Sequence, residues 1–466
     1  MSPNVSPNPA VRFIDERTGA APLMRKVMRY VFPEHGSFLL GEIALYAFLV
    51  LVATGIYLAL FFDPSLADTT YNGTYAPLRG LHMSQAYTSA IDLSFDDRTG
   101  LLMRQTHHWA ADVFLVSIVL HLMRVFFTGA FRRPRVLTWT LGVAMLFAAL
   151  LEGFLGYSVV DDLLSGAGLA IGYGVALSVP LVGGNLALGL WGAPFPGDQA
   201  FESRMFIAHV LLLPGLIGAL LTGHLALIAA RHHTQFRRSP RQTERRLLGL
   251  PTFPAQTPRS LGLLFATAAV LFGLGGLVQV NPVWLWGPFE LAQGTNGAQP
   301  DWYLGWLIGA LRLMPGFDVT IRDYTLIPNP FWGGVLFPTV VMSTMFLWPW
   351  IERRATGDRA VHNLLDRPRD APGRTAFGVA FFVWVVLIFL AGSADRVYVF
   401  FDLSYDEQIW FYRVVVWIAP VVAFLLTRRI CRELQRSDAI RAERERAERE
   451  AEQELVVRPA PASRAS

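Results

Sequence analysis

Long apolar stretches dominate this sequence. Eight of them contain about twenty or more mostly apolar residues, at 38–62, 102–128, 136–158, 203–230, 259–280, 331–350, 374–393 and 409–427. A helix needs roughly 20 such residues to cross the hydrocarbon core of a bilayer. A barrel of strands is excluded, because the stretches are too long and lack strict alternation. The pattern predicts an all-α polytopic membrane protein with eight transmembrane helices.

The composition excludes other classes of protein. Hydrophobic residues make up 53% of the chain and charged residues only 16%, whereas a typical soluble domain has about 25% charged residues. That much apolar surface excludes intrinsic disorder, and a single cysteine excludes a disulfide framework. The net charge of +4 is too small to indicate a nucleic-acid partner.

Arginine is distributed unevenly between the connections. Arginine clusters precede the first stretch and follow the second, fourth, sixth and eighth, whereas the other connections are poor in arginine. Basic loops stay on the cytoplasmic side of a membrane. We therefore expect both termini in the cytoplasm, and the connections 63–101, 159–202, 281–330 and 394–408 on the outer face.

Three segments outside the eight stretches have a helical character of their own. Residues 159–180 and 281–316 are apolar and aromatic but broken by Gly and Pro, which predicts short helices at the membrane surface. Residues 433–454 alternate Glu and Arg with Ala, which favours a solvated helix outside the membrane. An arm that docks a partner is the alternative.

Two predicted membrane helices carry spaced histidines. His107 and His121 are 14 residues apart, and His209 and His224 are 15 apart. Both spacings are close to four helical turns, so each pair lies on one face about 21–22 Å apart. Imidazole pairs at two depths suit six-coordinate haem irons, although His108 is an alternative to His107. Without a Cys-x-x-Cys-His motif, any haem would be b-type and non-covalent. Core histidines, or a proton relay in a transporter, are the other interpretations.

Glycines in the neighbouring stretches have a matching spacing. Gly41 and Gly55 are 14 residues apart, as are Gly142 and Gly156. Glycine lets a flat macrocycle approach the backbone closely. Helix–helix packing is the alternative explanation, but the common spacing with the histidines favours haem.

These motifs resemble those of the cytochrome b subunit of cytochrome bc complexes, the quinol–cytochrome c reductases. Arg104-x-x-His107-x13-His121-x-x-Arg124 is similar to the family's second-helix motif, and Arg204-x4-His209-x14-His224 to its fourth-helix motif. The resemblance covers about residues 15–427. The actinobacterial, menaquinol-using type is indicated by Thr106-His107-His108-Trp109, Asp161-Asp162-Leu163-Leu164-Ser165-Gly166 and Gln299-Pro300-Asp301-Trp302-Tyr303.

The resemblance implies a domain organisation and a bacterial cell-membrane location. It implies a cytoplasmic segment over 1–36, a four-helix haem-binding bundle over 37–246, a C-terminal four-span part over 247–427 with an outer quinol-site segment at 281–330, and a charged cytoplasmic tail over 428–466. It also implies two non-covalent b haems. The low-potential haem would lie between His107 and His209 near the outer face, and the high-potential haem between His121 and His224.

Arginines beside these histidines are expected to neutralise the haem propionates. By the resemblance they are Arg104, Arg124 and Arg204, and ordinary interfacial snorkelling is compatible with that role.

The resemblance places quinol oxidation at the outer face. The family's Pro-Glu-Trp-Tyr corresponds to Pro300-Asp301-Trp302-Tyr303, in which the carboxylate side chain is one methylene shorter. Asp301, with Tyr303, would accept a proton as the quinol is oxidised. Gly168 is expected to approach the quinol ring closely.

The facing wall departs from the family pattern. The family's Pro-Trp pair is replaced by Val160-Asp161, and Asp162 follows. The two aspartates either relay protons or cap the helix that they precede, and capping is favoured.

The second quinone site is expected near the cytoplasmic haem. Its candidates are His232, His233 and Glu244, just past the fourth stretch. The mitochondrial-type histidine five residues after the haem ligand is replaced by Ala229, and the two histidines can equally be ordinary interfacial residues.

The resemblance also implies an activity and its partners. Quinol would give one electron to a Rieske iron–sulfur subunit and one across the membrane through the two haems, coupled to proton translocation. A c-type cytochrome subunit, a homodimeric complex, a terminal cytochrome c oxidase and membrane lipid are the further expected partners. The alternative is a haem b anchor subunit of another quinone-linked oxidoreductase, although such bundles usually have only four or five spans.

Overall fold

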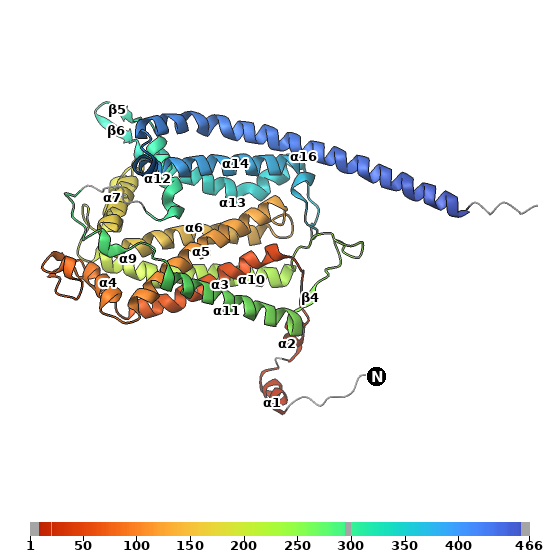
Figure 1. Cartoon of the computed structure of the whole chain (residues 1–466), viewed down its shortest axis with the longest axis horizontal. Helices are drawn as coiled ribbons and strands as arrows, with labels where there is room; N and C mark the ends of the chain where they lie inside the picture. Colours follow the sequence, from red (N-terminus) through yellow and green to blue (C-terminus); the bar gives the residue numbers. More distant parts are fainter. Residues whose placement is uncertain (1–8, 20, 294–299, 458–466) are drawn as a thin grey trace, which may run out of the picture.

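The spanning helices run side by side in one bundle (Figure 1). A computed structural model describes residues 9–19, 21–293 and 300–457. Within them, eight helices are long and apolar enough to cross a membrane, which confirms the predicted all-α architecture and number of spans. They are α3 (Leu39–Ala59), α5 (Gly100–Phe127), α6 (Val136–Ser158), the continuous α9 (Phe201–Ile207), η3 (Ala208–Leu212) and α10 (Leu213–Arg231), α11 (Thr257–Leu277), α13 (Phe337–Thr356), α14 (Pro372–Ala391) and α16 (Tyr405–Val457).

Small buried residues bring the first four spans together. α3 packs along α5, and α6 packs along α10. Ala47 and Ala110 are fully buried between such helices, and Ala148 and Ala149 are almost so. Small side chains let membrane helices approach closely and gain van der Waals contact. α11 then packs on α5 and α3, while α14 packs along α16 and also contacts α12 and α5.

Short elements cover both ends of the bundle (Figure 1). We call one end the α7 end, because it carries α4, α7 and α12, and the other the β4 end, because it carries α2 and β4. The connecting helices are α1 (Pro9–Thr18), α2 (Ala21–Met28), η1 (Gly36–Phe38), η2 (Ala76–Leu78), α4 (Gln85–Phe95), α7 (Leu163–Leu177), α8 (Gly183–Trp191), η4 (Thr252–Gln256), η5 (Val283–Leu285), η6 (Trp302–Leu304), α12 (Gly305–Leu313), η7 (Trp332–Leu336), η8 (Pro368–Asp370) and α15 (Ala394–Phe401). The antiparallel strand pairs are β1 (Val31–Phe32) with β4 (Leu250–Pro251), β2 (Asp68–Thr70) with β3 (His82–Ser84), and β5 (Val319–Ile321) with β6 (Tyr324–Ile327).

The α7 end contains the predicted short helices. α7 lies in the segment 159–180, and η5, η6 and α12 lie in 281–316. Asp162 is the N-cap of α7, because its side chain accepts a hydrogen bond of 2.8 Å from the backbone N–H of Ser165. The favoured capping interpretation therefore holds for Asp162. Asp161 is not the cap, and its backbone is in the left-handed region with φ of 56°.

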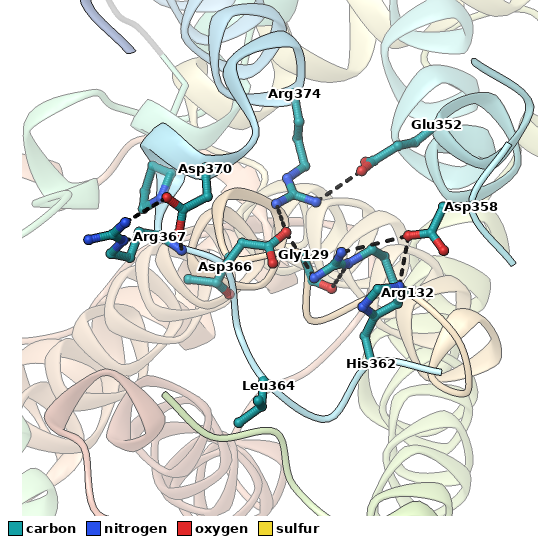
Figure 2. Close-up of polar contacts among 12 residues, drawn as sticks. Gly129, Arg132, Glu352, Asp358, His362, Leu364, Asp366, Arg367, Asp370 and Arg374 are labelled. Carbon is teal, nitrogen blue, oxygen red and sulfur yellow. Dashed lines mark hydrogen bonds and ion pairs between the residues drawn. The ribbon is translucent and has the colours of Figure 1, made fainter. Parts of the chain in front are cut away.

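A buried ion network joins the two halves of the chain (Figure 2). The guanidinium of Arg374 at the start of α14 is 2% exposed and contacts Glu352 of α13 at 2.9 Å and Asp366 at 2.6 Å. Arg132, from the connection between α5 and α6, contacts Asp366 at 2.8 Å. Gly129, with φ of 66°, leaves room for the Arg374 guanidinium, which a Cβ there would meet at 2.5 Å.

The final helix extends far beyond the bundle (Figure 1). α16 has 53 residues, so the helix predicted at 433–454 is confirmed and continues the last span without a break. Asp438 contacts Arg367 and Arg369 at 3.2 and 3.0 Å. Beyond it, all the side chains of 441–453 are exposed, in agreement with a solvated helix.

Candidate functional site

His107 and His209 face one another inside the bundle. Their ring centroids are 6.3 Å apart and the rings are nearly perpendicular, at 83°. A metal–imidazole bond is about 2 Å long, so one metal ion between two rings needs centroids about 6 Å apart. His209 lies in η3, a π-helical turn. Pro214 cannot donate to the backbone of Val210, and such turns are frequent at functional sites.

Each of the four histidines has a glycine of a neighbouring helix against its ring. A Cβ on Gly55 would lie 3.1 Å from Cε1 of His107, and one on Gly156 only 2.6 Å from Cε1 of His209. At the second histidine pair, a Cβ on Gly41 would lie 3.2 Å from Cε1 of His121, and one on Gly142 would lie 3.8 Å from Cε1 of His224. The predicted register of glycines and histidines is therefore present in the fold.

Three of the histidines have their Nδ1 atom occupied by a neighbour. Nδ1 of His107 lies 2.9 Å from the Thr54 hydroxyl, which itself donates to the Val50 carbonyl at 2.7 Å, so the imidazole must be the donor. Nδ1 of His224 donates to the Thr138 carbonyl at 3.0 Å. These bonds select the tautomer that leaves Nε2 free, as in metal-bound imidazoles.

Nδ1 of His209 lies 2.9 Å from Oε1 of Glu152. Our sequence reasoning missed Glu152, Thr54 and Thr138 as partners of the histidines. Glu152 had a signal, because an acidic residue within a membrane span is rare and usually functional. Nothing distinguishes the threonine hydroxyl or the backbone carbonyl in the sequence.

Two of the three predicted arginines retain free buried donors. Nε and Nη2 of both Arg104 and Arg124 are buried and have no hydrogen-bond partner among the described residues. Such groups are costly unless an anion satisfies them. Arg204 differs, because it makes an ion pair of 2.8 Å with Asp198 and is about half exposed.

The chemistry of these donors fits a b-type haem at each pair. The imidazoles would offer nitrogen ligands to the iron, the glycines leave room for the imidazole rings, and Arg104 and Arg124 would offer donors to carboxylates. Across the described parts of the chain, no group of three or more His, Cys, Asp or Glu side chains could hold a metal ion.

His108 points to a different site from its neighbour His107. Its Nε2 donates to Oδ1 of Asp301 at 3.0 Å, and the Tyr303 hydroxyl donates to Oδ2 of the same carboxylate at 3.0 Å. Consecutive helical residues are about 100° apart around the axis. His108 is therefore a partner of Asp301 and not an alternative to His107, and our sequence reasoning missed that role.

The rest of the predicted quinol motif lies around this carboxylate. Pro300 precedes it, and Nε1 of Trp302 donates to Oδ1 of Asp112 on α5 at 2.8 Å. Gln299, the first residue of the quoted motif, lies outside the described residues. Trp302 and His108 thus attach the segment to α5 through two separate contacts.

The surroundings of Asp301 favour its ionised form. Burial acts to raise the pKa of this carboxyl group, but the interaction with His108 and the hydrogen bond from Tyr303 together lower the pKa below the ordinary value. A carboxylate is the form that can accept a proton. By contrast, burial raises the pKa of Asp161 and of Asp162 to about 6.

Gly168 faces a tyrosine side chain. A Cβ on Gly168 would collide with the hydroxyl of Tyr157, and one on Gly153 would lie 2.8 Å from the ring of Tyr303. The space beside Gly168 is thus filled by Tyr157, and a quinol ring would meet Tyr157 there first.

The candidates at the β4 end contact neighbouring side chains and backbone groups. His232 stacks on Tyr30 with centroids 5.3 Å apart, and its carbonyl accepts from Arg135 at 3.0 Å. Burial lowers the pKa of His233 to about 4. The Glu244 carboxylate accepts from the backbone N–H groups of Asn363 and Leu364, so it stabilises a loop.

The fold and these sites define a class: an integral membrane protein whose facing histidines could hold a prosthetic group. A family model described as "Cytochrome b(N-terminal)/b6/petB" matches residues 112–288. The cytochrome bc1 complex cytochrome b subunit of Streptomyces coelicolor is 45% identical over 424 residues, covering 91% of this chain and 77% of that protein. The corresponding subunits of Corynebacterium diphtheriae and Mycobacterium tuberculosis are 46% and 45% identical over 91% of this chain and 78% and 77% of theirs.

The fold agrees with a solved structure. A chain of a hyperthermophilic respiratory Complex III matches with a TM-score of 0.64 and 20% identity, over 89% of this chain and 99% of that one. The chain belongs to the cytochrome b subunits of cytochrome bc1 complexes. It is therefore a haem-binding subunit of a quinol–cytochrome c oxidoreductase.

Proposed function

We propose that the chain holds two non-covalent b haems, one between His107 and His209 and one between His121 and His224. The 6.3 Å separation of the first two rings, and a glycine against each of the four imidazoles, support this assignment. When bound, the two haems supply one-electron carriers at two depths in the membrane.

The α7 end faces the outside of the bacterial cell membrane in this proposal, and both termini are cytoplasmic. The arginines of the network around Arg374 and Arg132 lie at the other end, where basic residues are retained. The N-terminal four spans form the haem-binding unit, and the C-terminal four carry the quinol-site segment 281–330.

Quinol, and specifically menaquinol, is oxidised at the α7 end. The Asp301 carboxylate, held by two donors, accepts a proton from the quinol hydroxyl, while Tyr303 and Trp302 shape the wall. One electron leaves to a Rieske iron–sulfur subunit and then to a c-type cytochrome subunit, and the other crosses the membrane. Protons are released outside, so the reaction translocates charge.

Quinone is reduced at the β4 end, close to the His121 and His224 pair. His233 is part of an aromatic cluster with Tyr30 and Phe38 there, with ring centroids 5.9 and 6.2 Å from its own. This chain works as a homodimer with its partner subunits, surrounded by membrane lipid, and delivers electrons toward a terminal cytochrome c oxidase.

The single observation that carries the quinol-oxidising role is the doubly held Asp301 carboxylate at the α7 end. A haem b anchor of another oxidoreductase has no need of it. Asp301→Asn should lower quinol–cytochrome c turnover by about 10²–10⁴-fold, the usual contribution of a general base, and leave the haem content intact.

The matched control is Asp68→Asn, which changes a carboxylate that is 69% exposed in strand β2. It should leave turnover unchanged. If Asp301→Asn is as active as Asp68→Asn, Asp301 is not on the proton path.

A further inference from the structure

His108 carries a contact that the haem assignment does not use. It follows His107 directly on α5, its side chain is 15% exposed, and its Nε2 donates to Asp301 at 3.0 Å. A buried polar contact of this length contributes to orientation as well as to stability. It joins two segments 193 residues apart in the chain.

The Asp301 carboxylate depends on donors from two elements. The Tyr303 hydroxyl on η6 holds Oδ2, and His108 on α5 holds Oδ1. Tyr303 lies only two residues from Asp301 on the same segment, and its ring is buried against Gly153 of α6. Among the described residues, His108 is the donor to this carboxylate that comes from a membrane-spanning helix.

The segment around Asp301 has a second attachment that does not involve His108. Trp302 donates to Asp112 at 2.8 Å, one turn further along α5. Removal of the His108 side chain should therefore leave the segment docked on α5 and free only Oδ1 of the carboxylate. Variants of His108 therefore test the orientation of Asp301 without undocking the segment.

We propose that His108 is a positioning residue of quinol oxidation, which holds the Asp301 carboxylate in the orientation that accepts the proton of the quinol. The proposal rests on the proposed function of Asp301. Because His107 and His108 are consecutive, the same turn of α5 positions both a haem ligand and the proton acceptor. The proton acceptor Asp301 and the haem ligand His107 are thereby held in fixed positions relative to each other.

The reach of the side chain gives a sharp test. In His108→Gln, the amide nitrogen can extend about as far from the backbone as Nε2 of the imidazole and can donate to Asp301. In His108→Asn, the amide is one methylene shorter and does not reach. His108→Ala removes the donor altogether.

The measurements use the purified complex, a soluble menaquinol analogue and cytochrome c. His108→Ala and His108→Asn should lower kcat by roughly 10–100-fold, since a misplacement of about 1 Å costs up to about 10²-fold. KM should change much less, and His108→Gln should recover most of kcat. In an Asp301→Asn background, His108→Ala should cause no further loss, because residues that act as one unit are not additive.

Haem content is measured in every variant, because His107 is adjacent. If His108→Ala loses haem, the positioning role is tested by comparing His108→Gln with His108→Asn, both at full haem content. Equal kcat in these two variants, or a full additional loss in the double variant, overturns the positioning role. If Asp301→Asn itself keeps normal turnover, the proposed function of Asp301 fails and the His108 proposal fails with it.

Discussion

Gly156 is the position at which the haem assignment can be tested most sharply by a single methyl group. A Cβ at Gly156 would lie 2.6 Å from Cε1 and 3.2 Å from Nε2 of His209. Carbon atoms in good contact are about 3.5–4.0 Å apart, so Gly156→Ala forces the imidazole to move. At Gly142, the same methyl group would lie 3.8 Å from His224 and fits without movement.

The expected magnitude follows from this clash. Overpacking a tight site costs about 1–3 kcal/mol, which weakens binding at the His107–His209 pair by roughly 5–150-fold. Both substitutions also remove a helical glycine, which stabilises a helix by up to about 1 kcal/mol. Because this gain is shared, the difference between Gly156→Ala and Gly142→Ala isolates the contact with the histidine.

The assay is a redox titration of the haem absorption in the purified variants, with a pyridine haemochrome count. Gly156→Ala should lose or shift one of the two components, and Gly142→Ala should keep both. An added Cβ would lie 3.1 Å from His107 in Gly55→Ala and 3.2 Å from His121 in Gly41→Ala. The effects of these two substitutions should therefore lie between those of Gly156→Ala and Gly142→Ala. If Gly142→Ala is as damaging as Gly156→Ala, the glycines serve helix packing and the reasoning is wrong.

Three further results are expected. Arg374→Met leaves the Glu352 carboxylate without its ion-pair partner, whereas Asp366 keeps Arg132. The free energy of unfolding should fall by about 3–5 kcal/mol, seen as faster thermal inactivation in detergent, and an unchanged half-life would contradict this. Tyr303→Phe removes a donor that lowers the pKa of Asp301, so the acid limb of kcat/KM should move to higher pH; an unmoved limb would show that the hydroxyl does not act on the carboxylate. Arg124→Met removes a buried positive charge, so a redox titration should show a lower midpoint potential for the haem at His121 and His224. An unchanged potential would show that the charge of Arg124 does not act on this haem.

Much of the fold was predictable because membrane helices are specified by length and apolarity. The eight spans agree with the predicted stretches to within a few residues at most ends. The last span shows the largest difference, because the charged segment after it has high helix propensity and α16 simply continues. A hydropathy pattern cannot show that a helix leaves the membrane without a break.

The histidine and glycine pairs were predictable because the helical period fixes which residues share a face. The partner of Asp301 was not, since His108 and Asp301 are 193 residues apart and no local pattern joins them. Spacing alone also left His108 as a rival to His107. The tertiary contacts separate their roles, because His107 faces His209 whereas His108 contacts Asp301.

The predicted roles of Arg204 and Gly168 depended on neighbours that sequence spacing does not reveal. Arg204 is paired with Asp198, six residues earlier in a connection. The space beside Gly168 is taken by Tyr157. A neighbouring side chain thus pairs with the Arg204 guanidinium in one case and fills the space beside Gly168 in the other.

The most direct test of the account is the number of b haems bound per chain in the purified protein, measured by pyridine haemochrome and resolved by redox titration. The account predicts two haems with separate midpoint potentials. His209→Leu should remove one component and His224→Leu the other. One haem or none in the unaltered chain, or loss of the same component in both variants, would contradict it.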